Sequence, residues 1–308
     1  MVRKIKKPTR TRASRTPVSG GLIRFFIQPL LQWLIRRPQW LLLVPLLMGL
    51  GYAYEWQIAR PQMAYMGVPK VEMNLPQAGV SHILRYDGFM LEYAEGLKNP
   101  LWVTYKVGPK RYSPGQRPSR FESEWFSLSR VSHDDYTGSG YDRGHMAPNY
   151  VIASRYGRQA QLDTFIMTNI TPQMPQLNQK SWQRLEELVA NDFSDKFGDF
   201  WVVTGPIFGD EPKHLKNASV AIPDAFYKIL IRPSSEDQPA NALAFIFPQT
   251  AKPNANLMSF VTTIDEIEAR TGIDFFHQFD DAFENLLEAS QTPEAWNLKA
   301  VANRPSRY

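Results

Sequence analysis

Residues Thr137–Asn149 read TGSGYDRGHMAPN, and this stretch holds the side chains best suited to chemistry. Two glycines lead into a short strand, and an acid, an arginine, a glycine and a histidine follow before Pro148 ends regular structure. Arginine clamps a phosphate through two parallel hydrogen bonds, and histidine is a base that can be neutral at physiological pH. Alternate residues of a strand share a face, so Arg143 and His145 are expected on the same side. A structural histidine held by Asp142 would fit this stretch about equally well.

A second segment, Asn169–Val189, reads NITPQMPQLNQKSWQRLEELV and predicts a helix that starts near Asn178. Glu186 lies eight residues after Asn178. At about 100° per residue the two side chains are roughly 80° apart around the helix, close to one face. An amide oxygen and a carboxylate placed in this way suit a hard cation such as Mg²⁺. Taken singly, Asn178 is better explained as a helix N-cap and Glu186 as part of a solvated helix face.

Several other chemistries are excluded by the sequence. The chain has no cysteine, which excludes disulfides, thiolate zinc sites, iron–sulfur clusters and a cysteine nucleophile. Walker A, GxSxG and HExxH motifs are also absent from the sequence. His133-Asp134-Asp135 looks like a metal cluster, but adjacent residues of an extended loop point in different directions, so we interpret it as a solvated turn.

Together the two segments resemble the DNA/RNA non-specific endonucleases of the ββα-metal superfamily, the family that includes mitochondrial endonuclease G. The matching residues are Asp142-Arg143-Gly144-His145 with Ala147-Pro148, then Asn169, Pro172-Gln173, Leu177-Asn178, Trp182 and Leu185-Glu186. Further matching stretches are VVTGPIF (Val202–Phe208), IPDAFYKILI (Ile222–Ile231), AFIFPQT (Ala244–Thr250) and TTIDEIEARTGIDFF (Thr262–Phe276). The resemblance covers about residues 80–290 and leaves the N-terminal part outside.

The resemblance implies a role for each residue of the motif. His145 would be the general base that takes a proton from the attacking water, and Asn178 would be the one direct protein ligand of a hydrated Mg²⁺, with Mn²⁺ as a substitute. Arg143 would stabilise charge on the phosphate, Glu186 would hold the waters around the metal, and Asn169 would support the site from behind. The substrates would be DNA and RNA of any sequence, cut to 5′-phosphate and 3′-hydroxyl ends. A homodimer is a further expectation.

A polyanionic substrate needs positive charge on the protein, so we consider how charge is distributed along the chain. Beyond residue 37 the chain has 25 basic and 30 acidic residues, so the basic pI belongs to the N-terminal part. Residues 141–184 nevertheless carry a local excess of positive charge, which would attract a phosphate backbone. The five basic residues expected to bind substrate are Arg143, Arg155, Arg158, Lys180 and Arg184. Any one of them alone would be explained as ordinary solvated surface.

The spacing of apolar residues predicts an α+β domain. Strand-like runs, separated by Gly, Pro, Asn and Asp, occupy Phe89–Tyr93, Trp102–Lys106, Trp201–Thr204, Ala225–Ile231 and Ala242–Phe247. Helical patterns occupy Gln179–Phe193 and Thr263–Thr271, and Thr263 is a plausible cap for the second. We therefore expect a mainly antiparallel sheet with flanking helices, which agrees with the ββα-metal fold that the resemblance implies.

The N-terminal part differs from the rest in composition. Residues 1–37 hold ten basic residues, and no acidic residue precedes Glu55. The following stretch, Pro38–Tyr54, is uncharged and mostly apolar, and would span roughly 25 Å as a helix. The positive-inside rule then places the N-terminus in the cytoplasm. The expected order is a largely disordered basic leader (1–37), a transmembrane signal anchor (38–56), a linker (57–79) and the endonuclease domain (80–308). A buried soluble helix and a cleavable signal peptide are the alternatives for the span.

More than one hypothesis is open for the compartment and for the activity. We favour a bacterial inner membrane with the domain in the periplasm. A mitochondrial inner membrane is the alternative, because an Arg-rich, acid-free leader precedes the apolar span. The activity expected first is that of a membrane-anchored nuclease. A phosphodiesterase acting on smaller phosphate esters and a catalytically silent nucleic-acid-binding membrane protein are the other two hypotheses.

Overall fold

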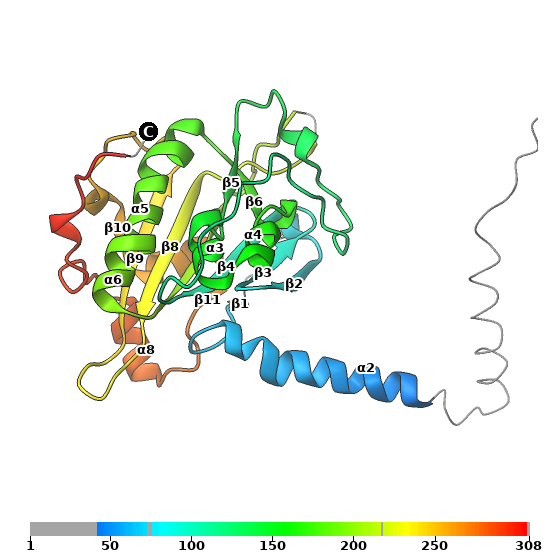
Figure 1. Ribbon diagram of the computed structural model, residues 1–308, viewed down its shortest axis with the longest axis horizontal. Helices are drawn as coiled ribbons and strands as arrows, with labels where there is room; N and C mark the ends of the chain where they lie inside the picture. Colours follow the sequence, from blue (N-terminus) through cyan, green and yellow to red (C-terminus); the bar gives the residue numbers. More distant parts are fainter. Residues whose placement is uncertain (1–41, 73–75, 217, 307–308) are drawn as a thin grey trace, which may run out of the picture. The chain divides into compact units, whose positions relative to one another are not determined.

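The computed structural model describes residues 42–72, 76–216 and 218–306 (Figure 1), which divide into one unit up to Trp56 and a second from Gln57 onward. The first unit contains helix α2 (Leu43–Tyr54), which has no charged residue and no buried one. Among the described residues, no helix combines the length and the apolar character needed to cross a membrane. The expected leader and the first residues of the expected anchor lie outside the described part of the chain.

A seven-stranded antiparallel sheet organises the second unit, in the order β10-β9-β8-β7-β4-β3-β2. All five predicted strands are confirmed, and each extends slightly beyond its predicted range. The strands are β2 (Ser81–Tyr86), β3 (Phe89–Ala94), β4 (Asn99–Val107), β7 (Phe200–Ile207), β8 (Ala225–Arg232), β9 (Asn241–Pro248) and β10 (Val261–Thr262). β2 is the longest strand that the sequence analysis missed; only half-buried or exposed residues form it.

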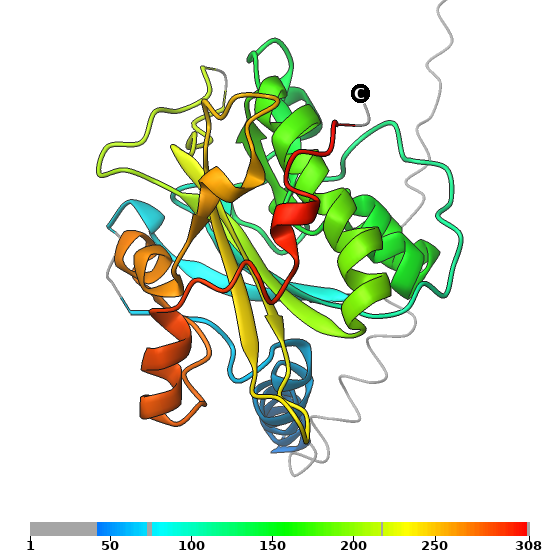
Figure 2. The same ribbon diagram turned by 90° about the vertical axis from the view of Figure 1, so that its left-hand side faces the viewer.

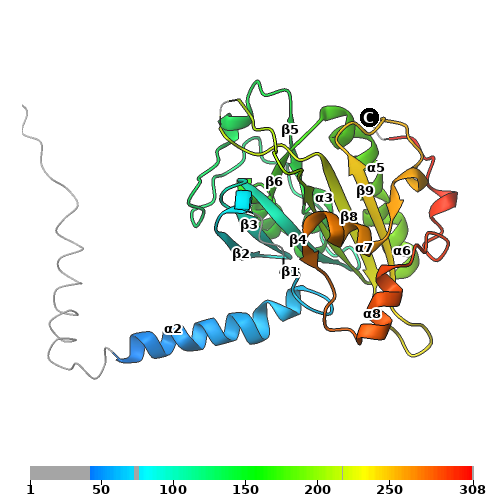
Figure 3. The same ribbon diagram turned by 180° about the vertical axis from the view of Figure 1, so that it is seen from behind.

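Both faces of the sheet are covered, because alternate residues of its strands are apolar on each side. On β8, Phe226 and Leu230 face one core, whereas Tyr227 and Ile229 face the other. The first core is covered by the green helices in Figure 2, namely α3 (Asn149–Tyr156), α4 (Arg158–Asp163), η7 (Leu177–Trp182), α5 (Gln183–Glu187), η8 (Leu188–Phe193) and α6 (Ser194–Phe197). The second is covered by the orange helices α7 (Ile264–Thr271) and α8 (Asp281–Glu288), seen from behind in Figure 3.

Two small antiparallel sheets complete the second unit. β5 (Asp142–His145) pairs with β6 (Ile170–Gln173), and β1 (Lys70–Val71) pairs with β11 (Ile273–Asp274). Besides η2 (Glu55–Ala59), which follows α2 directly in the chain, the remaining short helical elements are η3 (Pro61–Met63), η4 (Pro76–Ala78), η5 (His133–Tyr136), η6 (Met167–Asn169), η9 (Leu257–Phe260) and η10 (Leu298–Ala300).

Residues 57–72, expected to be part of a linker, belong to the fold instead. Ala59 and Ala64 are buried, and Tyr65 packs on the core beneath α7 and α8. The pairing of β1 with β11 then ties this segment to a strand about two hundred residues further along the chain. The prolines of this segment predicted a linker, but the apolar side chains between them pack on the core of the second unit.

Both predicted helices are confirmed, and one of them is longer than expected. The helical run predicted at Gln179–Phe193 extends continuously from Leu177 to Phe197, with two π-helical segments, η7 and η8. The Thr263 side chain accepts a hydrogen bond from the Glu266 amide at 3.2 Å and caps α7, as the sequence predicts.

Candidate active site

The two-stranded β5–β6 sheet and the helix after it place the residues of both sequence segments in one structural unit. In this sheet, Asp142 pairs with Gln173 and His145 with Ile170. Gly144 is required at its position, because a Cβ there would lie 2.1 Å from Oε1 of the Gln173 side chain. A larger residue at position 144 would have to displace the buried side chain of Gln173. The glycine of the DRGH sequence therefore leaves room for the Gln173 side chain from β6 to lie against β5.

His145 is nearly buried, at 9% exposure, between the rings of Phe121 and Phe165 at centroid distances of 5.3 and 4.9 Å. Its Nε2 is buried and has no hydrogen-bond partner among the described residues. Burial, and secondly the charge of Arg117, lower the pKa of His145 to about 3. The imidazole is therefore neutral near pH 7, and one of its ring nitrogens carries an unshared electron pair.

Asn169 is completely buried and holds the backbone that follows His145. Its Oδ1 accepts a hydrogen bond from the Ala147 amide at 2.8 Å, and its Nδ2 donates to the carbonyls of Ala147 and Thr164, each at 3.0 Å. With its amide used in this way, Asn169 acts through the main chain rather than on a ligand.

Asn178 lies in η7 with its amide oriented by β5. Its Nδ2 donates to Oδ2 of Asp142 at 2.9 Å, and the neighbouring Gln179 donates to the same oxygen at 2.8 Å. An amide that gives its NH₂ group to a carboxylate presents its carbonyl oxygen on the other side. Oxygen is the ligand atom that Mg²⁺ prefers. The residues present therefore fit a hard cation, which Asn178 Oδ1 would bind.

Glu186 follows on the same helical run and lies against the sheet. Its Oε1 lies 3.7 Å from Nζ of Lys228 on β8, and its side chain is 21% exposed. Burial raises the pKa of Glu186, and the positive charges of Lys228 and, more weakly, Arg117 oppose that rise. The sequence analysis proposed Glu186 but missed Lys228, which is hidden in a strand pattern.

Arg143 stands two residues before His145 on β5, a spacing that places both on the same side of a strand. Its guanidinium donates to the carbonyl of His133 at 2.6 and 3.1 Å and to Thr137 Oγ1 at 3.1 Å. The Phe121 ring contacts the rings of both His133 and His145, which places Arg143 beside the histidine pocket. His133 begins the short helix η5, which is held by a capping box, and this agrees with its interpretation as a turn.

Arg117 is a site residue that sequence reasoning missed. It lies in an exposed loop, with its guanidinium 5.4 Å from the centroid of the Phe165 ring. Its charge lowers the pKa values of both His145 and Glu186, so it lies close enough to act on both. Nothing in its local sequence distinguishes it from other loop arginines, because only the fold brings this loop to β5.

The structure corrects the expected set of substrate-binding residues. Arg155 is buried and donates to the carbonyls of Gly108 and Ala190, at 3.1 and 2.6 Å. Arg184 is equally buried, and it donates to two backbone carbonyls between the helical layer and the C-terminal segment. Both arginines join segments of the fold and cannot contact a phosphate backbone. Arg158 is exposed, although it holds the Gln116 carbonyl, and Lys180 is half-buried.

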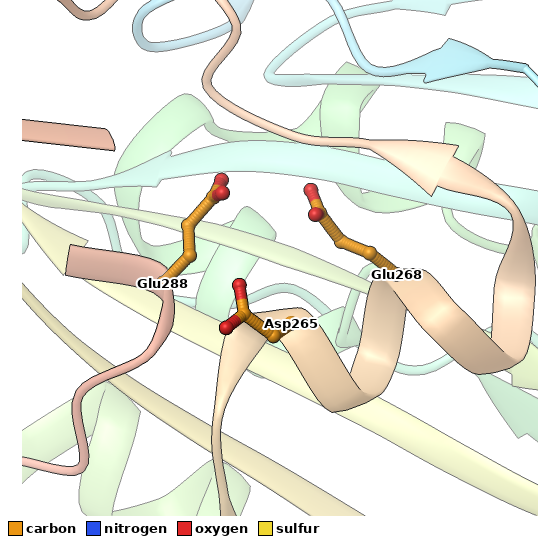
Figure 4. A group of neighbouring side chains, drawn as sticks. All are labelled: Asp265, Glu268 and Glu288. Atoms are coloured by element: carbon orange, nitrogen blue, oxygen red, sulfur yellow. The ribbon is translucent and has the colours of Figure 1, made fainter. Parts of the chain in front are cut away.

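A second group of carboxylates lies on the opposite face of the sheet, where it was not expected from the sequence. Asp265 and Glu268 on α7 and Glu288 at the end of α8 bring one oxygen each to within 4.8 Å of the others (Figure 4). Glu288 is 6% exposed. Burial, and then repulsion from neighbouring carboxylates, raises the pKa of Glu288 to about 9, whereas burial raises that of Glu268 to about 7. The group is therefore strained when it is fully ionised.

We expect Glu288→Gln to stabilise the protein in metal-free buffer at pH 8. The pKa of Glu288 is raised in the folded state, so its contribution to stability is complete below about pH 4.5 and is lost as the pH rises toward 9. The glutamine variant loses this penalty, and should gain roughly 2–4 kcal/mol at pH 8. Urea unfolding between pH 5 and 9 measures the effect. Glu266→Gln, on an exposed part of α7, is the control. Parallel pH profiles for wild type and Glu288→Gln would contradict the prediction.

The sequence of this chain matches those of known nucleases. The sequence model for DNA/RNA non-specific endonuclease matches residues 69–282. The mitochondrial endonuclease G of Homo sapiens is 29% identical over 212 residues, which cover 64% of this chain and 70% of that protein. A nuclease from Nostoc sp. is 27% identical over 222 residues, which cover 68% of this chain and 78% of that protein.

A solved structure shares the fold. A chain in the crystal structure of the EndoG/EndoGI complex, which describes a mechanism of EndoG inhibition, superimposes with a TM-score of 0.59 at 22% identity. The match covers 71% of this chain and 91% of that one, and it confirms the α+β arrangement of a central antiparallel sheet with flanking helices. With the family match spanning most of the folded unit around the β5–β6–helix site, the chain belongs to the DNA/RNA non-specific endonuclease family, and it is a hydrolase of nucleic acids.

Proposed function

We propose that the protein is a Mg²⁺-dependent endonuclease that cleaves DNA and RNA without sequence preference to 5′-phosphate and 3′-hydroxyl ends. One observation carries the proposal. The β5–β6–helix unit holds a neutral histidine, His145, and an amide, Asn178, whose NH₂ group is bound to Asp142, so that its oxygen would be left for a cation. A proton acceptor and a hard-cation ligand on one small motif are what phosphodiester hydrolysis requires.

Each side chain would contribute through its own chemistry. His145 would accept the proton of the attacking water, because its ring is neutral and its Nε2 has no partner among the described residues. Arg117 and Arg143 would balance the charge that develops on the phosphate. Asn178 would hold the cation, and Glu186 would hold the waters around it. A bound Mg²⁺ would supply Lewis-acid stabilisation of the phosphate and of the departing 3′ oxygen.

The test uses the full-length protein with supercoiled plasmid and with structured RNA, in Mg²⁺, in Mn²⁺ or in EDTA. We expect both substrates to be degraded with either metal and to survive EDTA. Products that DNA ligase joins without prior phosphorylation would confirm the 5′-phosphate ends. An intact plasmid together with a cleaved chromogenic diester would instead indicate a phosphodiesterase for small esters. Binding of DNA without cleavage would indicate a silent nucleic-acid-binding protein.

We also propose that the N-terminal part anchors the protein in a bacterial inner membrane, with the enzyme in the periplasm. The ten basic residues before Pro38 and the uncharged stretch up to Tyr54 support this topology. Helix α2, which has no charged and no buried residue, would offer apolar surface to lipid. The mitochondrial inner membrane stays the alternative compartment, and the homodimer stays a prediction from the sequence.

The topology predicts opposite results for two fusions in a bacterial host. Alkaline phosphatase joined after Tyr308 should be active, because it folds into its active form only outside the cytoplasm. Green fluorescent protein at the same position should stay dark when it is exported through the Sec route. Fluorescence without phosphatase activity would place the enzyme in the cytoplasm and overturn the anchor orientation.

A further inference from the structure

Lys228 is a buried charge in the middle of the sheet. It lies on β8 with no exposed surface, on the same face as Phe226 and Leu230, which belong to an apolar core. Lysine is almost never buried completely unless it is paired. Its Nζ makes no hydrogen bond among the described residues. An explanation for this lysine must therefore come from the charges and rings around it.

The groups around Lys228 belong to the helix that carries Asn178. Its Nζ lies 3.7 Å from Glu186 Oε1 and 4.3 Å from the centroid of the Trp182 ring. Trp182 precedes Glu186 by four residues, about one helical turn. The Lys228 ammonium therefore contacts two successive turns of this helix from the side of the sheet. Two other titratable groups interact with Glu186. Burial, and then the charge of Glu186, raise the pKa of the Tyr105 phenol, and the charge of Arg117 lowers the pKa of Glu186.

Stability does not explain this ion pair. Removing a fully buried ammonium from water costs several kcal/mol, and a buried pair is often matched or surpassed in stability by apolar residues of similar volume. Methionine at position 228 would continue the pattern of Phe226 and Leu230. Compared with an apolar residue, Lys228 therefore lowers the stability of the fold, and it does so at a position beside the carboxylate of Glu186. Lys228 also lowers the tendency of Glu186 to take up a proton when it is buried.

We propose that Lys228 is a positioning residue, which fixes the Glu186 carboxylate on the helix that carries Asn178, so that Glu186 can hold the waters of a cation bound there. The proposal rests on the proposed function, in which Glu186 would act beside the metal. Lys228 itself touches neither the cation nor the nucleic acid, because it lies inside the sheet. Its effect is therefore expected in kcat and in metal affinity, and the KM for DNA should stay unchanged.

The test is a double-mutant cycle with Lys228→Met, Glu186→Gln and the combined variant. Lys228→Met should lower kcat and weaken Mg²⁺ binding, measured by calorimetry, by about 10- to 100-fold, as loss of a partner that orients a metal-site residue typically does. Glu186→Gln should do the same. In the combined variant the losses should not multiply, because both substitutions remove one interaction. Leu230→Met, two residues away on the same face, is the packing control and should behave as wild type.

Thermal unfolding supplies a readout that does not depend on activity. Glu186→Gln leaves a fully buried ammonium unpaired and should lower the unfolding temperature, and adding Lys228→Met should restore it. Wild-type kcat and Mg²⁺ affinity in Lys228→Met, or losses that multiply in the combined variant, would overturn the proposal. If the wild type cleaves no nucleic acid, the proposed function fails. Mg²⁺ affinity and unfolding temperature would then still decide whether Lys228 and Glu186 act together.

Discussion

Replacing His145 by alanine should lower the rate of plasmid cleavage by at least ~10²-fold at neutral pH, which is the usual contribution of a positioned general base. The ring is neutral and nearly buried, and none of the described groups competes for its Nε2. Loss of the side chain removes the imidazole that lies between the rings of Phe121 and Phe165. Steady-state cleavage of a fluorescent oligonucleotide measures the effect.

The control for this variant is a test that the protein is still folded. His145 makes ring contacts rather than side-chain hydrogen bonds that hold other segments, so the variant should unfold cooperatively, and its circular dichroism should match that of the wild type. Because the pKa of His145 is lowered to about 3, the wild-type kcat/KM should show no loss from protonation of this histidine between pH 5 and pH 8. A folded His145→Ala protein with wild-type rates would remove His145 from the mechanism.

Replacing Asn178 by alanine should abolish Mg²⁺-dependent cleavage, whereas Glu186→Gln should reduce it by a smaller factor. Asn178 provides the oxygen that would bind the cation directly, and its amide is oriented by the bond to Asp142. Glu186 would act on the cation through bound waters, and loss of such a supporting residue typically lowers metal affinity or activity about 10- to 100-fold. Titrations of activity against Mg²⁺ for both variants measure the difference.

Gln179→Ala is the matched control for Asn178→Ala. Both side chains donate a hydrogen bond to Oδ2 of Asp142, at 2.8 and 2.9 Å, but Gln179 is exposed. If the bond to Asp142 were the important feature, the two variants would lose activity equally. We expect Gln179→Ala to keep most of its activity. An Asn178→Ala protein with the wild-type Mg²⁺ dependence would show that the cation is bound elsewhere.

Local patterns were enough for most of the sheet and for the site motif. Alternation or continuous apolar character marks strands such as β8 and β9, because a strand repeats every two residues whatever its neighbours are. The DRGH sequence and the helix that starts near Asn178 were recognised because their residue types carry the chemistry themselves. The same local logic failed for residues 57–72, where prolines suggested a linker and long-range pairing with β11 decided otherwise.

The sequence by itself determined the α+β class, the family resemblance and the placement of His145 on a strand and of Asn178 and Glu186 on a helix, since each depends on short patterns of residues that can be recognised one at a time. Only the tertiary structure decided which charges are buried. Arg155 and Arg184 look like surface arginines in the sequence, yet their guanidinium groups bind backbone carbonyls of distant segments. Likewise, Lys228 meets Glu186 only because the order of the strands puts β8 beneath the helix. Burial and pairing depend on contacts between segments far apart in sequence, and no local pattern encodes such contacts.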